Sequence, residues 1–223
     1  MEKRKVAFVH TSPPAVGPLM RFYTESAPEL EITNLLDDGL LRLLAAGDHR
    51  TAEARLRDML GVAAGTYGAE AAMITCSSVS KEMVGRLAES FALPVIKIDY
   101  PMARRAVGAG RRVGVAATFP PTLGPTSKLI SEAAAEAGAE IEIVQEVAPG
   151  AYDALLSGDA ERHDELLLEC VERLVGRDVA VVVLAQVSMA RVLPKLEGRV
   201  RVPVLSSLQT SLEALRAALP NAG

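Results

Sequence analysis

Short apolar runs that end in turn residues alternate along the chain with longer stretches of helical periodicity. Because strands that alternate with helices form parallel sheets covered on both faces, this pattern predicts an α/β fold. The apolar runs predict strands at residues 5–10, 30–34, 71–75, 94–98, 112–117, 141–145, 179–185 and 203–205. The periodic stretches predict helices at residues 17–27, 126–138 and 209–219, and two more that begin after the Gly-Asp pairs 47–48 and 158–159.

The pattern repeats itself in the second half of the chain. Residues 6–18 match residues 113–125 at an offset of 107, and they share a Thr, a Pro-Pro pair and a Gly-Pro pair in the same order. The match resumes at an offset of 111 with Glu31 on Glu142, Gly39 on Gly150 and the two Gly-Asp pairs on each other. The four added residues amount to about one helical turn, so the first helix of the second half should be longer. Asp48 and Asp159 should both be N-caps.

The duplication predicts two doubly wound domains, each with a parallel four-stranded sheet, related by a pseudo-twofold axis with one site in the cleft between them. The first half would comprise residues 1–100 together with 206–223, and the second half residues 101–205. Ligands of such sheets bind beyond the carboxyl ends of the strands.

Composition narrows the class of protein. Apolar residues make up 49% and charged residues 23%, which is typical of a soluble globular chain. The net charge is −4 and the basic residues are scattered, which argues against a nucleic-acid partner. The longest apolar run is too short to span a membrane, and the first apolar stretch breaks too early for a signal peptide. Two cysteines fit a reducing compartment, so we expect a cytoplasmic location.

No cofactor or metal is expected. The chain has neither a GxGxxG sequence after a strand nor a phosphate-binding GKS or GKT sequence, which makes a nucleotide or flavin binder a distant alternative. Three dispersed histidines do not form a metal-ligand set.

Hydroxyl side chains gather at the expected strand ends. Together with free backbone N–H groups they would form a receptor for a small carboxylate substrate. The expected carboxylate-binding residues are Thr11, Ser12, Ser77, Ser78, Thr118 and Ser188, with Thr122 as a further candidate.

Cys76 is the strongest candidate for chemistry, because it follows a strand and should precede a helix, whose N-terminus favours the thiolate form. The alternative is a small buried cysteine that only fills space. His10 is either an acid–base partner of Cys76 from the neighbouring strand or a histidine satisfied by a backbone carbonyl. Cys170 should lie in the core, whereas His49 and His163 should be solvated at the starts of helices. Asp99, with the tyrosine after it, should form a hinge or cap.

Three segments carry a resemblance to a known family: Thr75-Cys76-Ser77-Ser78, residues 113–118 and residues 184–190. Together they resemble the aspartate/glutamate racemase superfamily, which includes hydantoin racemases, maleate isomerase and arylmalonate decarboxylase. The resemblance implies cofactor-independent chemistry with one cysteine on each side of the substrate. Cys76 matches the first cysteine. At the offset of 111 the second position falls on Val187, which cannot transfer a proton, and Gln186 and Ser188 beside it are poor acids.

The sequence therefore predicts a racemase-superfamily enzyme that acts on the carbon next to a carboxylate of a small amino acid or diacid. Cys76 would be its one thiol. The alternatives are a decarboxylase, a cis-trans isomerase and a carboxylate-binding protein without turnover. The sequence is also compatible with a homo-oligomer.

Overall fold

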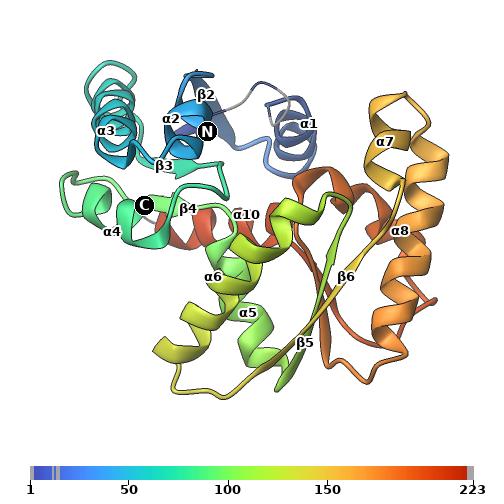
Figure 1. The fold of residues 1–223 in the computed structure, drawn as a ribbon. Helices are drawn as coiled ribbons and strands as arrows, with labels where there is room; N and C mark the ends of the chain where they lie inside the picture. Colours follow the sequence, from blue (N-terminus) through green and yellow to red (C-terminus); the bar gives the residue numbers. More distant parts are fainter. Residues whose placement is uncertain (1–2, 12, 14–15, 220–223) are drawn as a thin grey trace. The chain divides into compact units, whose positions relative to one another are not determined.

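The computed structural model describes residues 3–11, 13 and 16–219 (Figure 1). The strands are β1 Arg4–His10, β2 Leu30–Leu36, β3 Ala71–Ile74, β4 Val95–Lys97, β5 Arg112–Ala117, β6 Glu142–Val147, β7 Val181–Leu184 and β8 Val204–Ser206. The α-helices are α1 Val16–Ser26, α2 Leu40–Ala45, α3 His49–Gly65, α4 Lys81–Ala88, α5 Tyr100–Ala109, α6 Leu123–Glu136, α7 Ala151–Leu156, α8 Ala160–Val175, α9 Leu193–Leu196 and α10 Ser207–Ala218. Two 3-10 helices are η2 Pro120–Thr122 and η3 Val187–Val192.

The predicted α/β class is confirmed. The strands form two four-stranded sheets in the orders β2-β1-β3-β4 and β6-β5-β7-β8, and every pair is parallel. The two orders are the same permutation, as a duplicated chain requires. β1 and β3 are neighbours, so the ends of the first and third strands do meet at one edge of the sheet.

The chain divides into two compact units. Unit 1 contains the residues up to Asp99 and those from Ser211 onward, and unit 2 contains Tyr100–Thr210. The division falls inside α10, so the last two turns of that helix belong to the first sheet. None of the helices in the described residues is long and apolar enough to cross a membrane.

Unit 1 buries side chains on both faces of its sheet. Alternation along β1 sends Ala7 and Val9 into a cluster with α3 and α4, where Leu56 and Leu60 are fully buried. On the opposite face the Phe8 ring packs edge-on against Tyr23 of α1, with ring centroids 4.7 Å apart. An aromatic contact thus joins this face of the sheet to α1.

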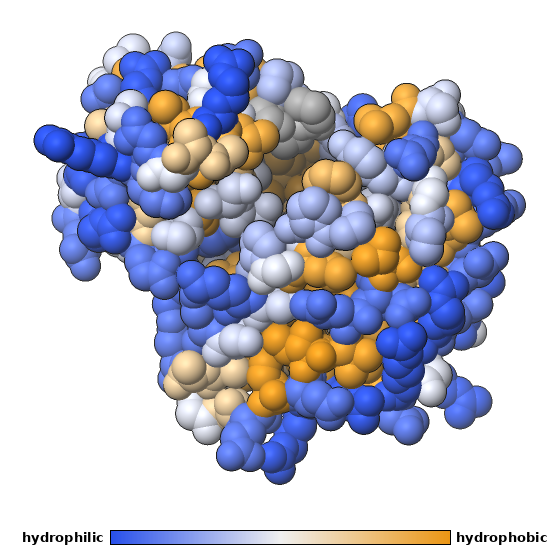
Figure 2. All heavy atoms as spheres, in the orientation of Figure 1, coloured by the Kyte–Doolittle hydropathy of each residue, from blue (hydrophilic) through white to orange (hydrophobic). Residues whose placement is uncertain are grey.

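Unit 2 repeats this arrangement. Val113 and Val115 of β5 pack with α5 and α6, and the other face of the sheet packs with α8, where Leu167 and Val171 are fully buried. The partly buried Ile143 of the edge strand β6 also contacts the cluster under α5 and α6. Figure 2 shows apolar side chains over this part of unit 2, surrounded by hydrophilic ones.

The predicted N-caps and the predicted difference in helix length are confirmed. The carboxylate of Asp48 accepts from the Thr51 N–H at 3.1 Å, and that of Asp159 accepts from the Arg162 N–H at 3.0 Å. Helix α6 has 14 residues against 11 in α1, as the shift in offset predicts.

Several short helices were not predicted, among them α2 and α7. α2 and α7 each have six residues and stand between the second strand and the Gly-Asp pair of their unit. A helix of this length has too few turns to show a periodic pattern, and its stability comes from packing. The duplication extends to these helices, because Leu40 and Ala151 are 111 residues apart.

The offset between the halves changes once more, and this corrects the sequence alignment. Val6 pairs with Ala71 and Val113 with Val181, so the third strands correspond at an offset of 110 rather than 111. The Thr75 N–H donates to the Val9 carbonyl and the Ala185 N–H to the Ala116 carbonyl, both at 3.0 Å, which fixes the same correspondence.

The loops after these strands share the register as well. The Val79 N–H donates to the Cys76 carbonyl at 3.4 Å, and the Met189 N–H donates to the Gln186 carbonyl at 3.1 Å. The residue equivalent to Cys76 is therefore Gln186, and the assignment of Val187 to this position was wrong. The physical reason is that α8 has one residue fewer than α3, a change that an amphipathic pattern does not reveal.

Candidate functional site

Cys76 lies directly beyond the carboxyl end of β3, in the loop between that strand and α4. Its side chain packs in the cluster that contains Val9 and Val79, and the residue is 9% exposed. The next two residues, Ser77 and Ser78, are exposed. The loop thus presents two hydroxyl groups to solvent beside a thiol that is nearly covered.

Cys76 is farther along the chain from the start of α4 than the sequence predicted. The N-cap of α4 is Ser80, whose hydroxyl accepts from the Met83 N–H at 3.2 Å. The field of a helix terminus falls off within about one turn. Cys76 precedes this cap by four residues along the chain.

His10 ends β1 and is fully buried. Its Nε2 lies 2.8 Å from the Asn34 Oδ1, and its Nδ1 lies 2.8 Å from the Thr75 Oγ1. Burial lowers the pKa of His10, although the hydrogen bond to Asn34 partly opposes this effect. In the neutral ring with its proton on Nε2, this nitrogen donates to the amide oxygen of Asn34, and Nδ1 can accept from the hydroxyl of Thr75, which also lies 3.2 Å from the Val9 carbonyl as a donor.

Both ring nitrogens of His10 therefore bond neutral side chains. This satisfies the histidine through side chains, whereas the sequence analysis considered a backbone carbonyl. Thr75 is the residue before Cys76, so the imidazole supports the start of the cysteine loop. Thr11, the next residue after His10, is also buried. Ser12, another expected carboxylate-binding residue, lies outside the described residues.

In unit 2, three hydrogen bonds converge on one oxygen atom at the equivalent edge of the sheet. The Gln186 Oε1 accepts from the Thr118 N–H at 2.8 Å, the Thr118 Oγ1 at 3.0 Å and the Phe119 N–H at 3.3 Å. These are the kinds of donor that the sequence analysis expected to bind a carboxylate oxygen. In this structure the amide oxygen of Gln186 occupies them.

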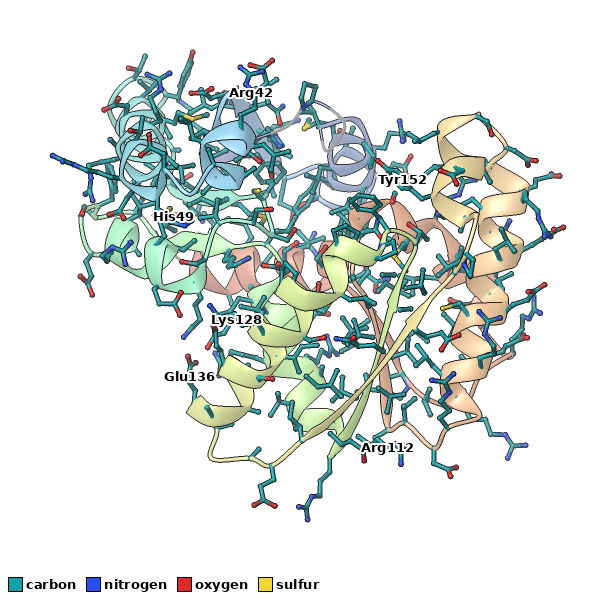
Figure 3. The ribbon with its side chains drawn as sticks, in the orientation of Figure 1. Arg42, His49, Arg112, Lys128, Glu136 and Tyr152 are labelled. Carbon is teal, nitrogen blue, oxygen red and sulfur yellow. The ribbon has the colours of Figure 1, made fainter. Side chains whose placement is uncertain are left out.

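The other expected residues of unit 2 have different positions. Thr122 donates its hydroxyl to the Phe119 carbonyl at 2.7 Å and so closes the turn of η2. Val187 and Ser188 are half-buried in the first turn of η3. The Phe119 ring packs on Tyr152 of α7, with centroids 4.9 Å apart; Figure 3 labels Tyr152.

A buried ion pair that was not predicted from the sequence lies beside the cysteine loop. Lys97 ends β4, and its Nζ lies 2.5 Å from the Asp99 Oδ1; the two side chains are 4% and 10% exposed. The same Nζ donates to the Ser77 carbonyl at 3.4 Å. The available signal was a lysine inside an otherwise apolar strand, followed two residues later by an aspartate.

The prediction that His163 is solvated was wrong. Its side chain is fully buried, its Nδ1 donates to the Asp164 Oδ1 at 2.9 Å, and its Nε2 has no hydrogen-bond partner in the described part of the chain. Asp164 also accepts from Arg191 at 2.8 Å and Lys195 at 2.7 Å. Burial raises the pKa of Asp164, but the bonds from Lys195 and His163 and the nearby positive charges outweigh it, so the net pKa is lowered.

Two other predictions are confirmed. His49 is exposed at the start of α3 (Figure 3). Cys170 is fully buried on α8, and burial raises the pKa of its thiol to about 12. Cys170 therefore stays protonated and shielded from solvent, and it is a structural residue.

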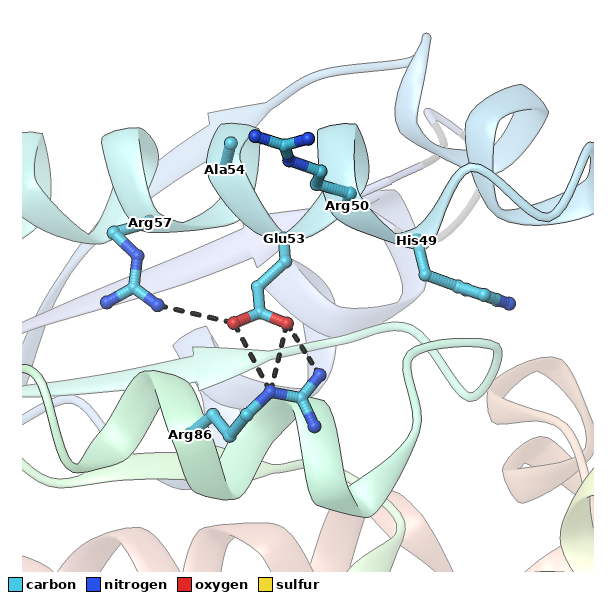
Figure 4. Close-up of a pocket in the computed structure, with 6 residues that line it drawn as sticks. All are labelled: His49, Arg50, Glu53, Ala54, Arg57 and Arg86. Carbon is cyan, nitrogen blue, oxygen red and sulfur yellow. Dashed lines mark hydrogen bonds and ion pairs between the residues drawn. The ribbon is translucent and has the colours of Figure 1, made fainter.

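A pocket of about 390 Å³ lies between α3 and α4 and is lined by arginines (Figure 4). Its central carboxylate, Glu53, lies 2.5 Å from the Arg86 Nη2 and 3.3 Å from the Arg57 Nη2. The carboxylate neutralises part of this positive charge, and the described residues that line the pocket include neither a cysteine nor a serine. The pocket is a surface network of ion pairs.

Comparisons with known proteins agree with this architecture. The family model described as Asp/Glu/Hydantoin racemase matches residues 27–215. An aspartate racemase homologue from Pyrococcus horikoshii has a TM-score of 0.70 at 14% identity, over 97% of this chain and 98% of that one. Arylmalonate decarboxylase has a TM-score of 0.69 at 16% identity, over 98% and 94% of the two chains. Glutamate racemase from Bacillus anthracis has a TM-score of 0.66 at 14% identity, over 99% and 85%. None of the curated protein sequences gives a match.

Proposed function

The chain belongs to the Asp/Glu/hydantoin racemase family, and from this premise we propose that it is a cofactor-independent enzyme acting on the carbon next to a carboxylate of a small amino acid or diacid. Cys76 is its one reacting thiol. The observation that carries the proposal is the position of Cys76 immediately beyond β3 at the carboxyl edge of a parallel sheet, where ligands of such sheets bind.

In this proposal the Cys76 thiolate removes the proton from the α-carbon, so that sulfur gains a proton and the carbon keeps the electron pair. The charge moves onto the carboxylate as an enediolate. Hydroxyl and N–H donors stabilise such charge where it develops. Thr11, Ser12, Ser77, Ser78, Thr118 and Ser188 are the proposed donors.

A single thiol has a stereochemical consequence. Racemisation needs a second acid on the opposite face of the carbon, and removing one partner of an acid–base pair costs about 10²–10⁴ in rate. Gln186, at the position equivalent to Cys76, carries an amide that does not supply a proton. The same thiol therefore returns a proton to the face from which it took one, and exchange outpaces inversion.

The test is incorporation of deuterium from D₂O at the α-carbon over a panel of amino acids and small diacids, with enantiomeric composition measured in parallel. We expect at least one compound to exchange faster than it racemises, and Cys76→Ser to abolish this exchange. Cys170→Ser is the matched control and should leave exchange unchanged. The enzymatic proposal fails if no compound exchanges, isomerises or loses CO₂ and Cys76→Ser changes nothing.

Decarboxylation is the second candidate, and the structural likeness to arylmalonate decarboxylase favours it. Loss of CO₂ from a malonate-type diacid produces the same enediolate, which one thiol then protonates on one face. Release of CO₂ from such a diacid, with incorporation of one solvent deuteron, distinguishes this reaction from exchange. Binding of carboxylates without either reaction would support a binding protein.

A further inference from the structure

The buried ion pair of unit 1 has no counterpart at the equivalent position of unit 2. Lys97 pairs with Ile74 in the sheet register, and Ser206 pairs with Leu184. Because Ile74 and Leu184 correspond, Lys97 and Ser206 occupy the same place in the two sheets. The Ser206 Oγ is buried without a hydrogen-bond partner in the described residues.

The difference between Lys97 and Ser206 accompanies the difference between Cys76 and Gln186 in the loops above them. The half with a thiol beyond its third strand has an ammonium group beneath that loop, bound to the Ser77 carbonyl at 3.4 Å. The half with an amide at the same position has a neutral serine. A buried charge pair carries a desolvation penalty and is weak evidence for stability alone. Its presence in only one of two equivalent sites therefore indicates a role tied to the Cys76 loop.

We propose that Lys97 is a positioning residue for Cys76, oriented by Asp99. The Nζ holds the Ser77 carbonyl and thereby fixes the peptide bond between Ser77 and Ser78, one residue beyond the cysteine. The functional part of this inference rests on the proposed chemistry of Cys76, whereas the structural part does not.

The primary test is hydrogen exchange of the backbone amides of residues 76–79 in the full chain. Lys97→Met combined with Asp99→Asn removes both charges and leaves neither partner buried and uncompensated. We expect these amides to exchange about tenfold faster or more in the double variant, because the loop loses its anchor. Wild-type exchange rates in a folded double variant would overturn the proposal.

Arg4→Met combined with Glu70→Gln is the matched control. This ion pair, with 2.5 Å between the Arg4 Nη2 and the Glu70 Oε2, joins the starts of β1 and β3 at the opposite edge of the same sheet. Its removal should leave exchange at residues 76–79 unchanged. Equal loosening in both double variants would show a general loss of stability and would also overturn the proposal.

The rate at which iodoacetamide alkylates Cys76 provides a second measurement, which reports on the thiol itself. The rate at Cys76 is followed against pH by mass spectrometry, with the buried Cys170 as the internal reference. In the Lys97/Asp99 double variant we expect Cys76 to be alkylated faster across this pH range, because a loop that has lost its anchor exposes the nearly covered thiol more often. An unchanged alkylation rate would show that Lys97 does not hold the loop over the thiol, and it would overturn the proposal.

If the double variant does not fold, Asp99→Asn alone provides the same test, since it keeps Lys97 and changes only the group that orients it. Unchanged exchange in this variant would contradict the role of Asp99. Both readouts are independent of turnover. Loop loosening in a chain without any activity would refute the proposed function alone, and an active chain with an unaffected loop would refute this inference alone.

Discussion

Gln186 is the residue that most clearly distinguishes the two sheet edges. Its amide holds three donors through one oxygen, whereas the equivalent Cys76 carries a titratable group. The two residues occupy the same register position beyond strands that are paired in the same order. A single substitution at this position therefore tests the stereochemical argument.

Gln186→Cys should add a second thiol and raise racemisation relative to deuterium exchange. We expect an increase of about tenfold or more in this ratio, as restoring an acid–base partner is worth about 10²–10⁴ when its geometry is good. Chiral chromatography of a compound that the wild type exchanges provides the measurement. Val187→Cys moves the thiol by one residue and should not raise the ratio. An equal gain in both variants would contradict the register.

His10 should make the fold sensitive to mild acid. Because burial lowers its pKa in the folded state, the unfolded chain binds the proton more readily, and stability declines as pH falls below the ordinary value of about 6.5. In urea unfolding at pH 7.5 and pH 5.5, wild type should lose more free energy of unfolding on acidification than His10→Gln. His49→Gln, which alters an exposed histidine, should behave like wild type. The same acid sensitivity in His10→Gln would refute this assignment.

Among the elements, α8 is tied to η3 and α9 through one carboxylate. Asp164 receives bonds from His163, Arg191 and Lys195, and this explains why a charged residue is buried on a helix. Asp164→Asn should cost about 1–3 kcal/mol in the free energy of unfolding at pH 7, because the buried donors lose a charged acceptor. Glu165→Gln removes only an exposed ion pair and should cost about 0–1 kcal/mol.

The contribution of Asp164 should also depend on pH. Its pKa is lowered in the folded state, so the stabilisation is present above the ordinary value of about 3.9 and is lost as pH falls through the folded value. The difference in stability between wild type and Asp164→Asn should therefore shrink on acidification below pH 4. A constant difference from pH 7 to pH 3 would show that the charge of Asp164 is not the cause.

Local features of the sequence predicted most strands and the longer helices. Features that depend on tertiary packing could not be predicted. The strands were recognisable from short apolar runs, and the caps from Asp48 and Asp159, because each depends on neighbours along the chain. The missing residue in α8 was invisible, since a helix one residue shorter keeps an amphipathic pattern. This deletion displaced the assignment of the second site from Gln186 to Val187.

The candidate site divides in the same way. Cys76 and the hydroxyl residues could be located because strand ends are readable, and their functional roles remain predictions. The bonds of His10 to Asn34 and Thr75 come from two other strand regions and have no local signal. Lys97 did leave a signal, a charge in an apolar strand, but its partners Asp99 and Ser77 could be assigned only with the fold.

At the scale of the whole molecule, the two units differ in how the chain builds them. Unit 2 is one continuous segment, whereas unit 1 needs the second part of α10. Ser211 of α10 bonds the buried Tyr23 hydroxyl at 2.8 Å, and the Arg216 Nε donates to Glu29 at 2.8 Å. Leu212 and Leu215 of the same helix are buried. Unit 1 is therefore incomplete without a helical segment from later in the chain, although all four strands of its sheet come from residues 4–97.

A fragment of residues 100–210 should fold alone, because it contains its own sheet and both covering layers. A fragment of residues 1–99 should not fold until a peptide of residues 207–219 is added. Circular dichroism with thermal melting checks both expectations. A cooperative transition of fragment 1–99 without the peptide would contradict the role assigned to α10, and a peptide with Leu212 and Leu215 changed to Ser should fail to restore folding.

The discontinuity of unit 1 also sets an order of events during synthesis. Domains generally fold as units as the chain emerges, with the amino-terminal one first. Here the later unit is complete once residue 210 has been made, whereas the earlier one waits for residues 211–219. The half that carries Cys76 should then be the last to close, so its thiol becomes shielded only after the rest of the protein is in place.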